Sequence, residues 1–341
     1  MFQTKLKQLV AGNTLSEQEA EAAMDEIMEG RATSAQIAGF LAMLSLRGET
    51  AAELTGCAIS MRAHARPISV RRKVLDIVGT GGDGTGTFNI STAGAITLSA
   101  LGVDVAKHGN RSVSSTSGAA DVLEALGVPI RMTPEQAREI LDRTHMCFLF
   151  APIYHASMKY AIEPRKALGF RTIFNLLGPL TNPAGAARQL LGVFNEKAAE
   201  MYAHALLRLG TERTLVVTGE DGMDELTITG ATKAYLVENQ SIRSFIIRPE
   251  EVGLEVGRLA DLKVGNPAES AALIEAIFSG TSANRPAVNA VLLNAGAGLF
   301  VAGRAETIAV GVREAAQAIR SGSALKQLRL LREQSKEVAH A

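Results

Sequence analysis

The sequence predicts an α/β protein in which a small N-terminal helical domain precedes a large domain with a mostly parallel central sheet. Residues 1–66 contain three helix-capping patterns and no strand-like run, whereas from residue 74 onward apolar runs alternate with helical segments. Such alternation is typical of parallel sheets covered by helices. With 341 residues and 47% hydrophobic content, the chain can bury one large core and a smaller one. We therefore place the domains at 1–66 and 72–341.

Helices are expected throughout the first 66 residues. Three begin at capping boxes, in which a hydroxyl and a carboxyl or amide three residues later satisfy free backbone N–H groups. These pairs are Ser16 with Glu19, Thr33 with Gln36, and Thr50 with Glu53. A shorter helix is expected around residues 6–9. The helix after Thr33 has an apolar face made of Ile37, Phe40, Leu41 and Leu44. A four-helix domain has too little chain to cover its apolar faces, which must pack against the rest of the chain or another subunit. For the face after Thr33 we expect a homodimer.

The larger domain is expected to alternate strands and helices. Candidate strands span residues 74–78, 103–106, 146–150, 190–194, 214–218 and 234–237. Helices are expected to begin near Ser91, at Pro134 after a Thr133 cap with Gln136 three residues later, and at Glu196 after an Asn195 cap.

Composition excludes several classes of protein. The 35 basic and 35 acidic residues balance, which argues against a general nucleic-acid or anionic-membrane surface. The two cysteines, Cys57 and Cys147, lie in apolar stretches and are interpreted as core residues of a disulfide-free protein. Neither a signal peptide nor a long apolar run is seen. We expect a cytoplasmic protein that binds neither nucleic acid nor membranes.

The stretch DIVGTGGDGTGTFNIST, residues 76–92, is interpreted as a strand, a glycine loop and a helix start. Residues 79–84 match the G-x-G-x-x-G pattern of dinucleotide-binding loops, and Asp104 lies where that pattern has an acid. However, Asp104 falls early in the next strand, and seven further residues precede the helix. A P-loop is excluded because no Gly-Lys-Ser/Thr follows. A dinucleotide site is therefore disfavoured.

The same loop offers donors for phosphate oxygens, since backbone N–H groups and the dipole at a helix start bind anions. Its polar side chains are Thr85, Thr87, Asn89, Ser91 and Thr92. The segment KHGNRSVSS, residues 107–115, follows the next strand and adds further donors. These are Lys107, His108, Asn110, Arg111, the Gly109 N–H and the hydroxyls of Ser112, Ser114 and Ser115. Both loops should meet at the carboxyl edge of the sheet, which predicts a ligand with several phosphates.

A carboxylate-rich segment, TGEDGMDELT at 218–227, follows another candidate strand. It supplies Glu220, Asp221, Asp224 and Glu225. Taken alone, these could form a solvated turn. A polyphosphate ligand usually brings Mg²⁺, which prefers oxygen ligands. The position of the segment at the same edge of the sheet favours Asp224 and Glu225 as the metal ligands.

Four segments together resemble the anthranilate phosphoribosyltransferase family, which has the nucleoside phosphorylase/phosphoribosyltransferase fold. They are GTGGDGTGTFNIST, KHGNRSVSS followed by SGAADVLEALG, HASMKYAIEPRKALGFRTIFNLLGPLTNPA, and DELT. The resemblance implies a helical domain joined to an α/β domain, a homodimer formed through the helical part, and Mg²⁺, with two ions per subunit. It also implies a pentosyl transfer in which the amine of anthranilate attacks C1 of 5-phosphoribosyl 1-pyrophosphate. This reaction is the second step of tryptophan biosynthesis from chorismate.

The resemblance also implies roles for individual residues. The phosphoribosyl donor would be bound by Gly79, Gly82, Asp83, Thr87, Asn89, Ile90, Ser91, Thr92, Lys107, His108, Gly109, Asn110, Arg111, Ser112, Val113, Ser114, Ser115 and the backbone of Ala119. Anthranilate would contact Gly79, His108, Asn110, His155, Met158 and Arg165, whose guanidinium suits a carboxylate. The metal ligands would be Ser91, Asp224 and Glu225. For His155 and Met158, plain helix packing remains the alternative. No residue is expected to act as a general acid or base, since an aromatic amine is neutral at pH 7 and electrostatic stabilisation of the leaving group suffices.

Two positions depart from the family pattern. Thr116 stands where members usually have Lys or Arg, and Ala119 where they usually have Ser. Both changes concern affinity for the donor more than the reaction.

Two rival functions remain. A pyrimidine nucleoside phosphorylase shares the fold but would have different loop motifs, and a non-catalytic nucleic-acid binder is disfavoured by the zero net charge.

Overall fold

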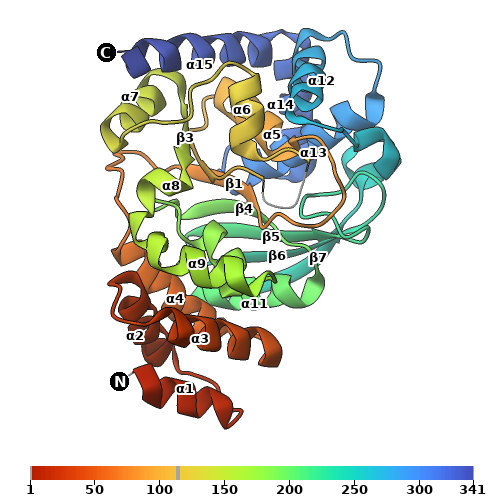
Figure 1. The fold of residues 1–341 in the computed structure, drawn as a ribbon. Coiled ribbons are helices and arrows are strands. Elements are labelled where there is room, and N and C mark those ends of the chain that lie inside the picture. Colours follow the sequence, from red (N-terminus) through yellow and green to blue (C-terminus); the bar gives the residue numbers. More distant parts are fainter. Residues whose placement is uncertain (1, 113–115, 341) are drawn as a thin grey trace.

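The computed structural model describes residues 2–112 and 116–340 (Figure 1). The chain begins with α1 (Phe2–Val10), α2 (Glu17–Met28), α3 (Ser34–Arg47) and α4 (Ala51–Ala63). The capping boxes at the starts of α2, α3 and α4 are all formed. The predicted all-helical N-terminal part is therefore confirmed. The capping boxes expected from the sequence cap α2, α3 and α4.

The rest of the chain is built on a seven-stranded sheet with the order β3-β2-β1-β4-β5-β6-β7. The strands are β1 (Leu75–Gly79), β2 (Val105–Gly109), β3 (Met146–Phe150), β4 (Arg188–Gly192), β5 (Arg213–Gly219), β6 (Thr232–Glu238) and β7 (Ser241–Ile247). Pairings from β3 through β5 are parallel, and β6 and β7 are antiparallel. The prediction of a mostly parallel sheet is confirmed.

Helices cover both faces of this sheet (Figure 1). One face packs against α5 (Ile90–Ala100), α6 (Ala119–Ala125), α7 (Pro134–Thr144), α12 (Pro267–Ser279), α13 (Arg285–Val301), α14 (Ile308–Arg320) and α15 (Ser323–His340). The other face packs against the N-terminal helices together with α9 (Lys159–Leu168), α10 (Ile173–Leu177) and α11 (Glu196–Arg208). Neighbouring residues such as Leu190 and Leu191 point into opposite cores, as the two-residue period of a strand requires.

Some strand predictions were displaced or incomplete. The strand expected at 103–106 begins at Val105, because the chain turns at Gly102, which has φ of 75°, and the Val103 N–H bonds back to Leu98. The strand β7 was missed. It lies at the sheet edge with most side chains at least partly exposed, and its apolar run is limited to residues 245–247. Its hairpin turns through Asn239 and Gln240 at φ of 49° and 55° instead of through glycine.

The apolar face of α3 packs against the rest of the chain, so the expectation of a homodimer through that face was wrong. Ile37, Phe40, Leu41 and Leu44 are buried in one core with α1, α9 and α10. The rings of Phe2 and Phe40 lie 5.6 Å apart. Residues 161–180 thus complete the cover that α1 begins, and that face is not available to a second subunit.

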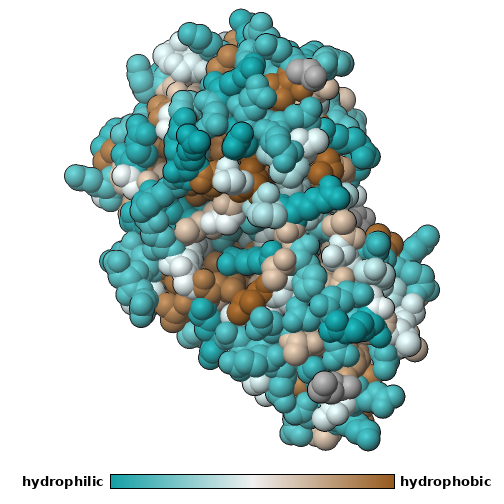
Figure 2. Space-filling view, turned by 90° about the vertical axis from the view of Figure 1, so that its left-hand side faces the viewer, coloured by the Kyte–Doolittle hydropathy of each residue, from teal (hydrophilic) through white to brown (hydrophobic). Residues whose placement is uncertain are grey.

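Polar side chains dominate the molecular face in Figure 2, where apolar residues lie among them in small groups. Within residues 2–112 and 116–340, no helix is both long and apolar enough to cross a membrane.

Candidate active site

The carboxyl ends of β1, β2 and β5 carry loops that line one cleft with a free volume of about 330 Å³. Segments far apart in the sequence meet there: the glycine loop 78–91, residues 107–112, the segment 171–179, and the Asp224-Glu225 pair. The predicted meeting of the two donor loops at the sheet edge is therefore observed. Val113, Ser114 and Ser115, which were expected to continue the second loop, lie outside the described residues.

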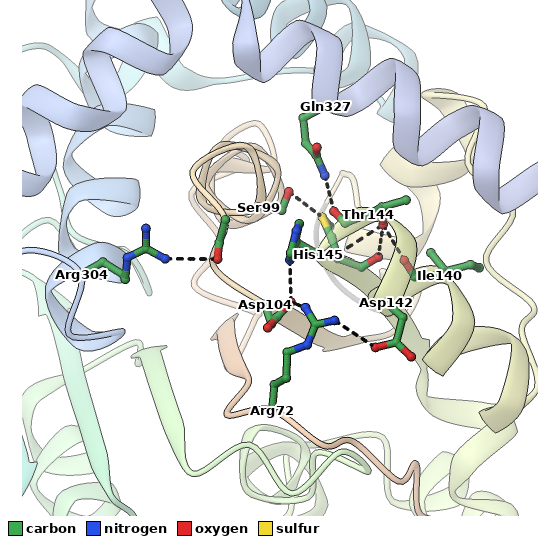
Figure 3. A network of polar contacts seen from close by, with 11 residues as sticks. Arg72, Ser99, Asp104, Ile140, Asp142, Thr144, His145, Arg304 and Gln327 are labelled. Carbon is green, nitrogen blue, oxygen red and sulfur yellow. Dashed lines mark hydrogen bonds and ion pairs between the residues drawn. The ribbon is translucent and has the colours of Figure 1, made fainter.

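Asp104 takes no part in this cleft. It immediately precedes β2, at the opposite end of the strand from the loop 107–112. Its carboxylate accepts from His145 Nδ1 at 2.8 Å and pairs with Arg72 at 3.3 Å (Figure 3). An acid that binds a ribose would have to stand at the carboxyl end of the strand. The geometry therefore removes the basis for a dinucleotide site.

The Asp224-Glu225 pair lines the cleft, with Asp224 buried and Glu225 half-buried, so the alternative of a solvated turn is wrong. Asp224 is buried, and its Oδ2 accepts a hydrogen bond from the Gly81 N–H at 2.6 Å. Glu225 Oε1 accepts from the Ser91 N–H at the start of α5, at 3.2 Å. Burial raises the pKa of both carboxyls, and each pKa is raised further by a neighbouring carboxylate, Asp83 for Asp224 and Asp224 for Glu225. A cation between them would relieve this repulsion.

The other two acids of this segment do not line the cleft. Asp221 Oδ2 accepts from the hydroxyls of Thr227 at 2.6 Å and Thr229 at 2.7 Å, so it holds the loop in shape. Space for Asp224 beside β1 is kept by Gly79, where an added Cβ would lie 2.4 Å from Asp224 Oδ2.

Lys107 is fully buried beneath the cleft floor. Its Nζ donates to the Ile77 carbonyl at 2.5 Å and to Ser91 Oγ at 3.1 Å. Burial lowers the pKa of Lys107, while Asp76, Glu225 and Asp224 oppose that shift. The ammonium therefore bonds to the start of α5 and is near enough to the carboxylate pair to balance part of its charge.

Asp76 supports the loop 107–110 from behind, a role that the sequence did not reveal. Its carboxylate accepts from the His108 N–H at 3.2 Å and from Asn182 Nδ2 at 2.8 Å. Complete burial raises the pKa of Asp76 to about 6. The backbone of His108 is thereby fixed to β1.

Other polar groups of the two loops already have partners within the protein. Asn89 Oδ1 accepts from the hydroxyls of Ser117 at 2.7 Å and Ser270 at 2.8 Å, which joins the glycine loop to α12. Asp83 accepts from Thr85 Oγ1 at 2.6 Å. Arg111 pairs with Asp121 at 2.9 Å and Glu124 at 2.6 Å. Ser270 was missed because it follows Asn89 by 181 positions, a separation that no local pattern reports.

Aromatic and cationic side chains form the other wall of the cleft. The guanidinium of Arg165 lies over the Phe174 ring, 5.2 Å from its centroid. The rings of His108 and His155 are 5.2 Å apart, and His108 Nδ1 lies 3.2 Å from the Gly178 carbonyl. Burial lowers the pKa of His108 to about 3 and that of His155 to about 4, so both are neutral at pH 7. His155 does not line the cleft itself, and Met158 packs on the helical core.

The sequence matches a known protein family over most of its length. Residues 71–325 match the glycosyl transferase family a/b domain, and residues 3–65 match the helical bundle domain of the same family. An anthranilate phosphoribosyltransferase from Shouchella clausii is 53% identical over 342 residues, covering 100% of both chains. One from Geobacillus kaustophilus is 53% identical over 340 residues, covering 100% of this chain and 99% of the other.

The chain belongs to the anthranilate phosphoribosyltransferase family. Solved structures agree: the Thermus thermophilus anthranilate phosphoribosyltransferase matches 97% of this chain and 99% of its own with a TM-score of 0.91 and 44% identity. A Saccharomyces cerevisiae anthranilate phosphoribosyltransferase in complex with PRPP and Mg matches 98% of both chains with a TM-score of 0.90 and 28% identity.

For an anthranilate phosphoribosyltransferase, the cleft offers a suitable set of oxygen donors for Mg²⁺. Among the described residues, no three His, Cys, Asp or Glu side chains converge on one point. Mg²⁺ is commonly held by one or two carboxylates together with substrate phosphates, and it retains several waters. The buried carboxylate of Asp224 and the half-buried one of Glu225, next to Ser91 and the glycine loop, match that requirement.

The two departures from the family pattern lie beside the second donor loop. Thr116 is exposed, and Ala119 lines the cleft as the first residue of α6. The Gly118 cap and the Ser112 N–H both donate to Asp121 Oδ2, at 3.1 and 2.9 Å. The backbone at this point is therefore fixed without help from either side chain.

Proposed function

We propose that this cleft performs the reaction of its family, in which the amine of anthranilate attacks C1 of 5-phosphoribosyl 1-pyrophosphate and pyrophosphate leaves. The product is N-(5-phosphoribosyl)anthranilate, formed in the second step of tryptophan biosynthesis from chorismate. The observation that carries the proposal is the convergence of a glycine loop, the Asp224-Glu225 carboxylate pair and the Arg165 wall on one cleft.

The donor is assigned to the glycine-loop side. Its phosphoribosyl part would lie against Gly79, Gly82, Asp83 and Thr87, and its pyrophosphate against residues 89–92 at the start of α5. Residues 107–112, and 113–115 beyond the described part, would complete the phosphate site together with the backbone of Ala119. Support comes from the start of α5, where the helix dipole favours an anion.

The acceptor is assigned to the opposite wall. Arg165 would bind the anthranilate carboxylate, because a guanidinium that stacks on Phe174 and has a lowered pKa from burial is poised for an anion. Gly79, His108 and Asn110 would contact the ring and amine, with His155 and Met158 behind them. Because His108 is neutral at pH 7, it places no positive charge beside the nucleophilic amine.

Catalysis in this proposal is electrostatic. Lys107 and the N–H groups at the start of α5 stabilise the negative charge that develops on the leaving pyrophosphate. Asp224, Glu225 and Ser91 would hold Mg²⁺, two ions per subunit, which supplies further neutralisation of that charge when bound. Since the attacking amine is already neutral, no side chain has to remove a proton before attack.

Assembly as a homodimer is proposed through a surface other than the α3 face first expected. Val10 on α1, Leu46 on α3 and Ile162 on α9 are 77%, 90% and 59% exposed, although their helices pack together. Exposed apolar side chains from adjacent helices are typical of a subunit interface.

We further propose that the protein is cytoplasmic.

The test is the loss of anthranilate fluorescence when the protein is mixed with 5-phosphoribosyl 1-pyrophosphate and Mg²⁺. Turnover that requires all three components supports the proposal. Phosphorolysis of thymidine or uridine, without consumption of anthranilate, would instead identify a pyrimidine nucleoside phosphorylase.

A further inference from the structure

Arg171 connects the helical side of the cleft to the glycine loop. Its Nη2 donates to the Gly81 carbonyl at 2.7 Å. Its guanidinium lies over the Phe194 ring, 4.5 Å from the centroid, just beyond the end of β4. Its own carbonyl accepts from Ser45 Oγ on α3 at 3.0 Å. One residue therefore touches α3, the segment after β4, and the loop after β1.

The peptide unit that Arg171 contacts is held from two sides. The Gly81 carbonyl accepts from Arg171, while the Gly81 N–H donates to Asp224 Oδ2 at 2.6 Å. The next residue, Gly82, has φ of 70°, and a Cβ added there would lie 1.8 Å from Arg171 Nη2. The close approach of the guanidinium thus requires a bare backbone at position 82.

The other cationic side chains of the cleft are differently engaged. Lys107 donates to Ile77 and Ser91 below the floor, and Arg111 pairs with Asp121 and Glu124 on α6. Arg165 stacks on Phe174, on the acceptor wall. Arg171 is exposed at the rim and directs its charge to the backbone of the glycine loop.

The two contacts of Gly81 differ in what substrate binding would do to them. If Asp224 turns to hold a metal ion, the Gly81 N–H loses its acceptor. The Arg171 contact involves only the carbonyl, so it can persist throughout. A charge-assisted hydrogen bond whose donor is also fixed by stacking on an aromatic ring is well suited to keep a loop in place.

We propose that Arg171 is a positioning residue for the phosphoribosyl donor: it latches the glycine loop to the helical side of the cleft in the conformation that receives the donor. The inference rests on the proposed function, because the loop is taken to bind the donor. The same contact couples the glycine loop to α10, which begins two residues after Arg171 and carries the acceptor-side residue Phe174.

The experiment compares Arg171→Ala and Arg171→Lys with the wild type, using Arg165→Ala as the matched control. Hydrogen exchange of backbone amides in residues 79–88 is measured on the protein without substrates, since exchange reports local opening. We expect faster loop exchange in Arg171→Ala. We expect wild-type exchange in Arg165→Ala, which lacks a loop contact, and near wild-type exchange in Arg171→Lys, whose ammonium can still donate to Gly81.

Kinetics on the same proteins supply the second readout. Arg171→Ala should raise KM for the phosphoribosyl donor about tenfold or more, the scale of a lost charge-assisted hydrogen bond, with a smaller change in KM for anthranilate. Arg171→Lys should recover most of the loss. Unchanged loop exchange in Arg171→Ala would overturn the latch, whether or not KM rises, because a raised KM alone would mean direct contact with the donor. A wild-type protein that does not consume anthranilate would refute the proposed function, while the exchange comparison would still decide the latch.

Discussion

The Asp224 carboxylate accepts a hydrogen bond from the Gly81 N–H, with 2.6 Å between Oδ2 and the nitrogen. The two residues are 143 positions apart, yet the contact joins the loop after β1 to the loop after β5. The proposed metal site and the proposed donor loop are therefore one structural unit. Changes that displace either should affect the other.

Gly79→Ala tests this coupling. The added Cβ would lie 2.4 Å from Asp224 Oδ2, so the carboxylate must move. Such overpacking costs about 1–3 kcal/mol, and we expect kcat/KM for the donor to fall roughly five- to a hundredfold with a higher Mg²⁺ requirement. Steady-state kinetics across Mg²⁺ concentrations provide the measurement. Gly39→Ala on α3, where an added Cβ has no neighbour within 4 Å, should leave activity unchanged. Equal behaviour of the two variants would refute the coupling.

Arg165→Ala should weaken anthranilate binding selectively. Loss of a charge-assisted hydrogen bond to the carboxylate costs about 1.5–3 kcal/mol, which corresponds to a roughly ten- to hundredfold increase in KM for anthranilate. KM for the phosphoribosyl donor should change much less. The exposed neighbour Lys166→Ala serves as the control. Equal increases in both KM values would contradict the assignment of Arg165 to the acceptor.

Burial of His155 makes the stability of the folded protein depend on pH. His155 has a pKa of about 4 in the folded protein, below the unfolded value of about 6.5, so the unfolded chain binds an extra proton between these values. Stability from the neutral ring is thus full above pH 6.5 and is lost as pH falls toward 4. Between pH 6 and 5, urea unfolding of the wild type should lose about 1.4 kcal/mol per pH unit more than His155→Gln. Parallel pH profiles would show that His155 does not titrate in this way.

Leu46→Glu tests the proposed subunit interface. Leu46 is 90% exposed, so a charge there should not disturb the monomer fold, but it would be buried unpaired in a dimer. Light scattering at micromolar concentration should give a dimer for the wild type and a monomer for Leu46→Glu. Val256→Glu, at another exposed apolar position, should remain dimeric. A monomeric wild type would exclude the interface.

Most of the fold could be predicted from local sequence patterns. Capping boxes at Ser16, Thr33 and Thr50 mark helix starts because the cap involves only residues three apart. Buried strands such as β3 were found from their apolar runs, whereas β7 was missed because an edge strand can be polar. The cover of α3 was misjudged, since it comes from a segment more than 100 residues later.

The candidate site was predictable to the level of its loops. Each loop follows a strand, and parallel strands bring their carboxyl ends to one edge. Contacts between loops were not predictable, because Asp224 with Gly81 and Asn89 with Ser270 join residues with no shared local pattern. Arg171 was likewise overlooked, since an arginine at a rim has no distinguishing spacing until its acceptor at Gly81 is known.

The central claim is that the Asp224-Glu225 pair holds Mg²⁺ for the departing pyrophosphate. Replacing both with Asn and Gln removes two partly buried charges and the repulsion among Asp83, Asp224 and Glu225, which adds to burial in raising the pKa of both carboxyls, so the protein should stay folded. The most direct measurement is kcat of Asp224→Asn/Glu225→Gln against wild type across a Mg²⁺ titration. It follows anthranilate consumption, with circular dichroism confirming the fold. We expect kcat to fall by about a hundredfold or more and the Mg²⁺ dependence to move to higher concentration. Near wild-type kcat at limiting Mg²⁺ would contradict the metal role and the mechanism built on it.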